Sequence, residues 1–241
     1  MLCPVYAPRS AQANADPGEE EVQLALRDGT NTLFFSHHVE CTDVPRGIVA
    51  LRDQLEILHV DNNYRFTSIS PRVTALTNLR WLNASYCSLR SVDFSISRLT
   101  KLERLTLNNN MLDWLPPEMA QLKSLNELHI GNNKFRVLPG CLLFLPHLRL
   151  LEMENNPFCT REAVEGAAAV TFIPPQRIVM CSSCFIHSRY YHVFVTFHRI
   201  LDHHDVPFVH LVCSEECAKH VRRRLEEYDL AHPSQRSSLD P

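Results

Sequence analysis

The chain has 241 residues, with 24 lysines and arginines against 27 aspartates and glutamates and a formal net charge of −3. Nucleic-acid binding depends on clustered lysine and arginine, so this balance argues against nucleic acid as a partner. No apolar stretch approaches the roughly 18 residues that cross a bilayer, and the sequence therefore predicts a cytoplasmic or nuclear protein with no membrane span.

The first 54 residues predict a tail followed by a cap. Residues 1–18 are rich in alanine, proline and polar residues and are expected to form a flexible tail. Within residues 19–54, the acidic and then apolar stretch 19–27 is typical of a short helix. Leu33 and Phe35 follow it as a degenerate copy of the pattern that fills the middle of the chain. We expect this segment to close one end of a repeat array.

Residues 55–159 repeat one sequence pattern. Copies of LxxLxLxxN begin at positions 79, 102, 125 and 148, which are 23 residues apart, and another begins at Leu55. In the first of the four, Ala84 and Cys87 replace the third leucine and the asparagine. A period of roughly 20–29 residues with this pattern is typical of leucine-rich repeats. The sequence therefore predicts an α/β repeat solenoid of five to six units, each with one short strand.

Side-chain alternation predicts which residues of each unit are buried. Leu105 and Leu107 should point inward and Thr106 outward, because neighbouring strand residues face opposite sides. The asparagines that end each motif, such as Asn110 and Asn133, should satisfy backbone groups at the turn after the strand. We therefore interpret these asparagines as structural.

The outward positions of the strands form columns across a concave sheet, and we predict that this surface binds a protein partner. Trp81 and Tyr86 supply the aromatic side chains that are common at interface hot spots, and we expect the Trp81 indole to be exposed. The alternative is that these columns are only solvated polar positions. The predicted partner-binding residues are Trp81, Tyr86, His59, Asn83, Thr106, His129 and Glu152.

Residues 160–178 predict a C-terminal capping helix and a linker. Val164, Ala168 and Phe172 lie four residues apart, so on a helix they form one apolar stripe. Such a stripe would cover the last repeat of the array.

Residues 179–230 contain a CxxC and a CxxxC pair, formed by Cys181, Cys184, Cys213 and Cys217. Four thiolates with this spacing can bind one tetrahedral Zn²⁺ and leave no ligand position for water. Between the pairs, alternating apolar residues around Val195 and a second apolar run at 208–212 predict two strands, joined by a polar loop at 202–205. Ser214 predicts the start of a helix. We therefore predict a small zinc-ribbon-like module with a structural metal.

Two alternatives to this metal site remain. The four cysteines could be buried free thiols, or His220 or His187 could replace one of them as a ligand, because imidazole also binds zinc. After the module, residues 231–241 contain two prolines and several polar residues and are expected to form a second flexible tail.

The order of these segments resembles a known family. NPF at residues 156–158 follows the repeats, and the chain later carries the ending PxxHxxCSxEC, formed by Pro207, His210, Cys213, Ser214, Glu216 and Cys217. In these features the chain resembles the family of leucine-rich repeat-containing protein 58, and more loosely the leucine-rich repeat substrate receptor of cullin-2 ligases. The likeness covers about residues 50–220.

This resemblance implies the substrate-recognition subunit of a cullin-RING ubiquitin ligase. Its implied partners are a protein substrate and elongin and cullin subunits, with the chain as a monomer within a larger complex. In that family an elongin-binding box follows the repeats. The best placement of a box-like helix here is Ala163, Val164, Ala168 and Phe172, with valine where the family has leucine.

The repeats alone would also suit a non-enzymatic signalling scaffold that binds a GTPase or a phosphatase. The motifs do not support an enzymatic function, because the sequence contains no GxSxG, no phosphate loop and no HExxH. We therefore expect a binding protein without catalytic activity.

Overall fold

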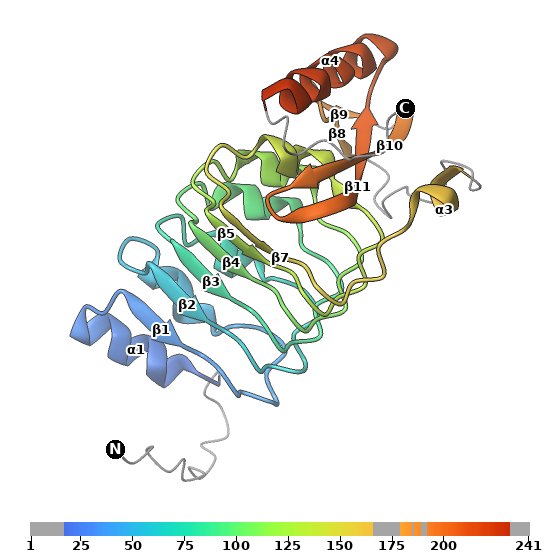
Figure 1. Cartoon of the computed structure of the whole chain (residues 1–241). Helices are drawn as coiled ribbons and strands as arrows, with labels where there is room; N and C mark the ends of the chain where they lie inside the picture. Colours follow the sequence, from blue (N-terminus) through green and yellow to red (C-terminus); the bar gives the residue numbers. More distant parts are fainter. Residues whose placement is uncertain (1–16, 166–178, 185, 189–191, 232–241) are drawn as a thin grey trace.

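A computed structural model of the chain describes residues 17–165, 179–184, 186–188 and 192–231 (Figure 1). Nearly all of the two predicted tails lies outside the described residues, as do Ala168 and Phe172 of the predicted box. Within the described ranges, no helix is both long enough and apolar enough to span a membrane.

Six short parallel strands form one sheet along the repeat array (Figure 1). They neighbour one another in chain order and pair in register, so that Leu82 lies opposite Leu105 and Leu105 lies opposite Leu128. The strands are β1 (Thr32–Phe34), β2 (Ile57–His59), β3 (Trp81–Asn83), β4 (Arg104–Thr106), β5 (Glu127–His129) and β7 (Leu150–Glu152). The predicted repeat solenoid is confirmed, and the degenerate first copy supplies β1.

The leucines of successive units stack into one core. Leu105 and Leu107 are completely buried, whereas Thr106 between them is partly exposed, as the alternation predicted. A strand of three residues cannot bury an apolar face alone, so each unit depends on its neighbours. Full burial of one such leucine stabilises the fold by about 1.5–3 kcal/mol, and this contribution recurs in every unit.

Short helical turns return the chain on the other side of each unit. Pro45, Pro116 and Pro139 directly precede three of them. Proline favours this position because its fixed φ suits the entry to a helix, where a missing N–H is tolerated. The turns are η1 (Arg46–Leu51), α2 (Pro71–Thr74), η2 (Phe94–Arg98), η3 (Pro117–Gln121) and η4 (Gly140–Phe144).

Helix α1 (Glu19–Asp28) lies beside β1 at the first end of the array, where the acidic and apolar stretch predicted a helix (Figure 1). Val22 and Ala25 are its buried residues and belong to the main core. The Glu19 carboxylate accepts a hydrogen bond from the Gly47 N–H at 3.2 Å, which ties the helix to η1.

The motif asparagines form the predicted ladder. Asn133 Nδ2 donates to Leu107 O at 2.9 Å and to Ile130 O at 3.0 Å, and Asn133 Oδ1 accepts from the Leu112 N–H at 3.0 Å. Where Cys87 replaces the asparagine, its thiol donates to Val60 O at 3.3 Å. Burial raises the pKa of Cys87 to about 11, so the thiol keeps the proton that this bond requires.

The C-terminal module consists of two antiparallel hairpins and one long helix (Figure 1). Its elements are β8 (Val179–Met180), β9 (His187–Ser188), β10 (His192–Ile200), β11 (His203–Val212) and α4 (Glu215–Ala231). The two predicted strands and the helix are confirmed. The predicted polar loop is too long, because His203 already pairs with Ile200 and only residues 201–202 remain as the turn.

The module shares its sheet and its core with the array. Strand β11 pairs in parallel with β6 (Leu138–Pro139), with Phe208 opposite Leu138, and both of these residues lie in the main core. The start of β11 reaches the last strand of the array, where His203 Nε2 lies 2.6 Å from Leu151 O. The predicted two-stranded sheet therefore gains a third strand, β6, which comes from a repeat.

Helix α3 (Arg161–Glu165) is the described part of the predicted capping segment. Val164 packs against a small apolar cluster that includes Trp114 and Val137 of the array and Val209 of the module. The apolar stripe predicted to cover the last repeat includes Ala168 and Phe172, which lie outside the described residues. The hairpin β10–β11 contacts the last strand through His203 and Leu151 O.

Candidate functional site

The four predicted metal ligands converge from three segments of the module. Cys181 follows β8, Cys184 ends the next turn, Cys213 follows β11 and Cys217 lies in the first turn of α4. Their Sγ atoms all lie within 4.8 Å of one another, and Cys213 Sγ is 3.5 Å from Cys184 Sγ and 3.6 Å from Cys217 Sγ. Thiolates bound at about 2.3 Å to a tetrahedral ion are about 3.8 Å apart. The cluster therefore fits one metal ion.

Backbone contacts hold these cysteines in place. The Ser183 and Cys213 N–H groups donate to Cys181 Sγ at 3.4 and 3.5 Å. Ser214 caps α4 as predicted, since its Oγ accepts from the Cys217 N–H at 3.2 Å. Within the described part of the chain the cluster contains only these four cysteines, so the alternative with His220 as a ligand is not supported.

The thiols of the cluster influence one another's ionisation. Hydrogen bonds with Cys184 and Cys217 raise the pKa of Cys213 to about 12, whereas the hydrogen bond with Ser214 lowers the pKa of Cys217 to about 7. Several adjacent thiolates repel one another unless a cation balances their charge. A divalent ion supplies that charge and deprotonates the thiols that coordinate it. With four protein ligands, such a site would be structural.

His210 from the PxxHxxCSxEC ending has a packing role. It is completely buried on β11, its Nε2 lies 2.8 Å from Thr196 Oγ1, and its ring stacks on Phe194 at a centroid distance of 4.9 Å. A Cβ atom at Gly140 would lie only 2.2 Å from the His210 ring, so glycine is required for this approach of η4 to β11. Burial lowers the pKa of His210 to about 3 and keeps the ring neutral.

The second candidate site is the concave face of the array. Phe34 stacks on His59 with ring centroids 4.8 Å apart, and His59 meets the edge of Trp81 at the same distance. The guanidinium carbon of Arg104 lies 4.7 Å from the Trp81 ring centroid. One aromatic and cationic stack therefore runs across β1, β2, β3 and β4.

An acidic continuation follows on β5 and β7. Arg104 binds Glu127 through Nε at 2.5 Å and Nη2 at 2.8 Å. His129 lies next to both carboxylates, with Nδ1 at 2.6 Å from Glu152 Oε2 and Nε2 at 3.5 Å from Glu127 Oε2. The hydrogen bond from Arg104 lowers the pKa of Glu127, and the one with His129 lowers that of Glu152. These carboxylates remain ionised at neutral pH.

The strand register places five predicted partner-binding residues in one column across the sheet, namely His59, Asn83, Thr106, His129 and Glu152. Tyr86 is 52% exposed, as expected for an anchor. The expectation of an exposed Trp81 is wrong, because Arg104 and His59 cover its ring and leave it partly buried.

Phe34 is the surface residue that the sequence analysis missed. It lies opposite His59 in the register, heads the same column and is 65% exposed. The signal was available, because alternation between the buried Leu33 and Phe35 turns Phe34 outward.

Tyr86 occupies a left-handed backbone position that asparagine fills in most other units. Its φ is 52°, and asparagines occupy this conformation at the equivalent positions of four other units, namely Asn62, Asn109, Asn132 and Asn155. Asparagine tolerates this conformation because its short polar side chain bonds locally, whereas an aromatic residue is strained there. Tyr86 therefore adopts this conformation at some cost in stability.

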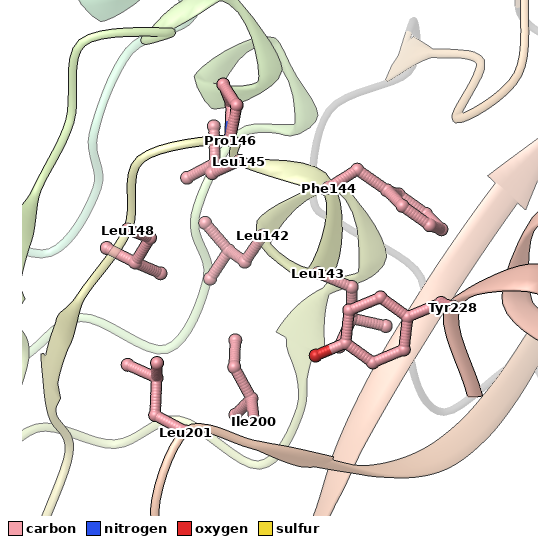
Figure 2. A pocket seen from close by; sticks show the side chains of 9 residues that line it. All are labelled: Leu142, Leu143, Phe144, Leu145, Pro146, Leu148, Ile200, Leu201 and Tyr228. Atoms are coloured by element: carbon pink, nitrogen blue, oxygen red, sulfur yellow. The ribbon is translucent and has the colours of Figure 1, made fainter. Parts of the chain in front are cut away.

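An apolar groove of about 300 Å³ lies where the module meets the array (Figure 2). Leucines from η4 and the following segment face Ile200, Leu201 and Tyr228 across it (Figure 2). Arg224 from α4 lies 3.9 Å from the Phe144 ring centroid at its border. The groove lies between the array and the module, which pack against each other in one core.

Comparison with protein families agrees with the repeat architecture. Residues 100–158 match the family model described as leucine rich repeat. Among solved structures, a leucine-rich repeat protein of Leptospira interrogans is 28% identical, with a TM-score of 0.46 over 50% of this chain and 30% of that chain.

The leucine-rich repeat ectodomain of the membrane receptor kinase GASSHO1/SCHENGEN3 from Arabidopsis thaliana, in complex with CASPARIAN STRIP INTEGRITY FACTOR 2, is 31% identical. Its TM-score is 0.43 over 47% of this chain and 14% of that chain. The chain thus spans less than a third of either protein. No curated protein matches it. The chain contains a leucine-rich repeat array, an architecture whose extended concave surface serves protein–protein interaction.

Proposed function

We propose that the chain is a non-enzymatic adaptor that captures a protein partner on its concave face. The observation that carries this proposal is the continuous contact chain from Phe34 to Glu152, which fixes aromatic and charged groups on six rigid strands. Preorganised side chains lose little entropy on binding, so such a face favours a specific partner. The strained Tyr86 beside it supports the same role.

The adaptor role that we favour is the substrate-recognition subunit of a cullin-RING ubiquitin ligase in the cytoplasm or nucleus. Its support is the resemblance carried by the PxxHxxCSxEC ending and the segment after the repeats. In that segment Ala163 is exposed while Val164 is partly buried, so only one face of α3 is free for an elongin-like partner.

We further propose that zinc is the metal of the cysteine cluster. Four soft thiolates in tetrahedral proximity favour zinc over the oxygen-preferring ions magnesium and calcium. In this role the ion would fix the start of α4 against the β8 turn and so hold the module on the array.

Affinity purification of the full chain followed by mass spectrometry tests the adaptor proposal. We expect a protein partner together with elongin and cullin subunits, and we expect the double change Trp81→Ala and Tyr86→Ala to remove the partner but keep the ligase subunits. Phe94→Ala on η2, which also removes an exposed aromatic ring, is the matched control and should retain everything. Recovery of a GTPase or phosphatase without ligase subunits would instead favour the scaffold.

A further inference from the structure

Resting on the proposed function, we infer that the concave face binds an extended basic segment of its partner, which places an apolar side chain at β1 to β3 and a lysine or arginine at β5 to β7. The two ends of the face differ in chemistry. Phe34, Trp81 and Tyr86 lie toward the first end, and ionised carboxylates lie toward the last.

The charge of the face supports a basic occupant. The outward positions of the six strands, together with the three residues after each strand, contain four carboxylates and one guanidinium, from Asp61, Glu127, Glu152, Glu154 and Arg104. Arg104 is already engaged by two hydrogen bonds to Glu127. Glu154 is exposed, and Glu152 has only the neighbouring His129 as an ion-pair partner among the described residues.

The turn of the C-terminal hairpin adds to this acidic end. His203 anchors the turn at Leu151 O on β7, and the preceding residue, Asp202, is exposed. A cation bound near Glu152 would therefore meet negative charge from Glu152 and Glu154 of the array, and Asp202 adds negative charge to the hairpin turn that lies against β7. An acidic segment of a partner would be repelled from this end of the concave face.

The strand spacing sets the spacing of the recognised residues. Adjacent strands are about 4.8 Å apart, so three steps from Trp81 on β3 to Glu152 on β7 cover about 14 Å. An extended chain advances about 3.3–3.6 Å per residue and covers that span in about four residues. Five steps from Phe34 to Glu152 cover about 24 Å, or about seven residues. The recognised segment should carry its basic residue about four or seven positions from its apolar one.

A phage-displayed library of random peptides, selected on the full chain, tests this inference. We expect enriched peptides to combine an aromatic or aliphatic residue with lysine or arginine at those spacings. A synthetic copy of an enriched peptide should bind about tenfold or more weakly to Trp81→Ala, and about fivefold more weakly to the double variant Glu152→Gln and Glu154→Gln. Added salt should weaken binding to the wild type more than to the double glutamine variant. Phe94→Ala is the control and should bind normally.

Each other outcome would refute either the basic segment alone or the proposed function as well. Peptides that need Trp81 but are acidic or uncharged would leave the concave adaptor in place and refute the basic segment. Peptides that bind equally well to Trp81→Ala would move the binding surface elsewhere and refute the proposed function as well. Absence of any enriched peptide would show that a linear segment is not the occupant, while co-purification of a folded partner that depends on Trp81 would preserve the adaptor.

Discussion

In the repeat array, leucines and an asparagine recur at the same positions of successive units. In the described part of the C-terminal module, by contrast, one cluster of four cysteines and one buried histidine occupy positions that do not repeat. Contacts in the array connect neighbouring units, so a defect there remains local. In the module the Sγ atoms of three segments meet at one point. Stability is therefore distributed in the first region and concentrated in the second, and perturbations should separate the two regions.

The largest effect should follow removal of the metal. We expect the folded chain to contain about one equivalent of zinc. A chelator or Cys213→Ser should disorganise the module and lower solubility, because metal affinity at such sites is folding free energy of about 10–16 kcal/mol. Strands β1 to β5 should stay folded, because contacts within the array connect neighbouring units. Elemental analysis and hydrogen exchange of α4 and β4 measure this. Cys159→Ser, outside the cluster, should retain the metal. A folded sample without metal would refute the zinc proposal.

A smaller loss is expected when one ladder position in the array is removed. Asn133→Ala deletes buried hydrogen bonds to Leu107 O, Ile130 O and the Leu112 N–H and should lower the free energy of unfolding by about 2–4 kcal/mol. Urea unfolding measures the loss, with the exposed neighbour substitution Lys134→Ala as the control. Zinc content should not change. An unaltered midpoint would mean that the ladder is dispensable.

The pH dependence of the module should reveal His210, the one histidine that is buried among the described residues of the module. The pKa of His210 is about 3 when folded, against about 6.5 when unfolded, so the unfolded chain binds the additional proton and stability falls as the pH drops below 6.5. Between pH 7 and pH 5 this contributes about 2 kcal/mol. His210→Gln, which can still bond Thr196, should reduce the measured difference by that amount. Equal pH dependence in both proteins would contradict the assigned burial.

The smallest change should be a gain in stability on the concave face. Tyr86→Asn restores the residue type that suits the left-handed conformation and should raise the free energy of unfolding by about 1 kcal/mol. We expect the same variant to weaken partner capture. Tyr64→Asn, also exposed but without a positive φ, is the matched control and should not gain stability. A loss of stability in Tyr86→Asn would show that the tyrosine side chain itself holds the fold.

The fold of the array was predictable because its signals are local and periodic. Buried leucines such as Leu105 and Leu128 lie 23 positions apart, and each asparagine follows at a fixed offset. The cysteine cluster was predictable for a related reason, since thiol spacing restricts which ligands can meet at one ion.

The features that the sequence did not predict depend on contacts between segments that are distant in sequence. No local pattern indicated that Leu138 in a return segment would pair with Phe208 seventy residues later, or that Gly140 would accommodate His210. Trp81 was expected to be exposed because the sequence of one unit does not show that Arg104 from the next unit covers it. Side-chain contacts between units need the stacking geometry as well as the repeat.

The module joins two successive units at once, since β11 pairs with β6 while His203 reaches Leu151 on β7. These two attachments fix the distance between β6 and β7. One additional repeat inserted between β6 and β7 would move Leu151 a whole unit away from His203 while β11 stayed in place. The array should therefore tolerate gain or loss of a repeat before β6, whereas a repeat inserted between β6 and β7 should break one of the two attachments. The number of units before β6 can vary, but the unit that contains β7 must directly follow the one that contains β6.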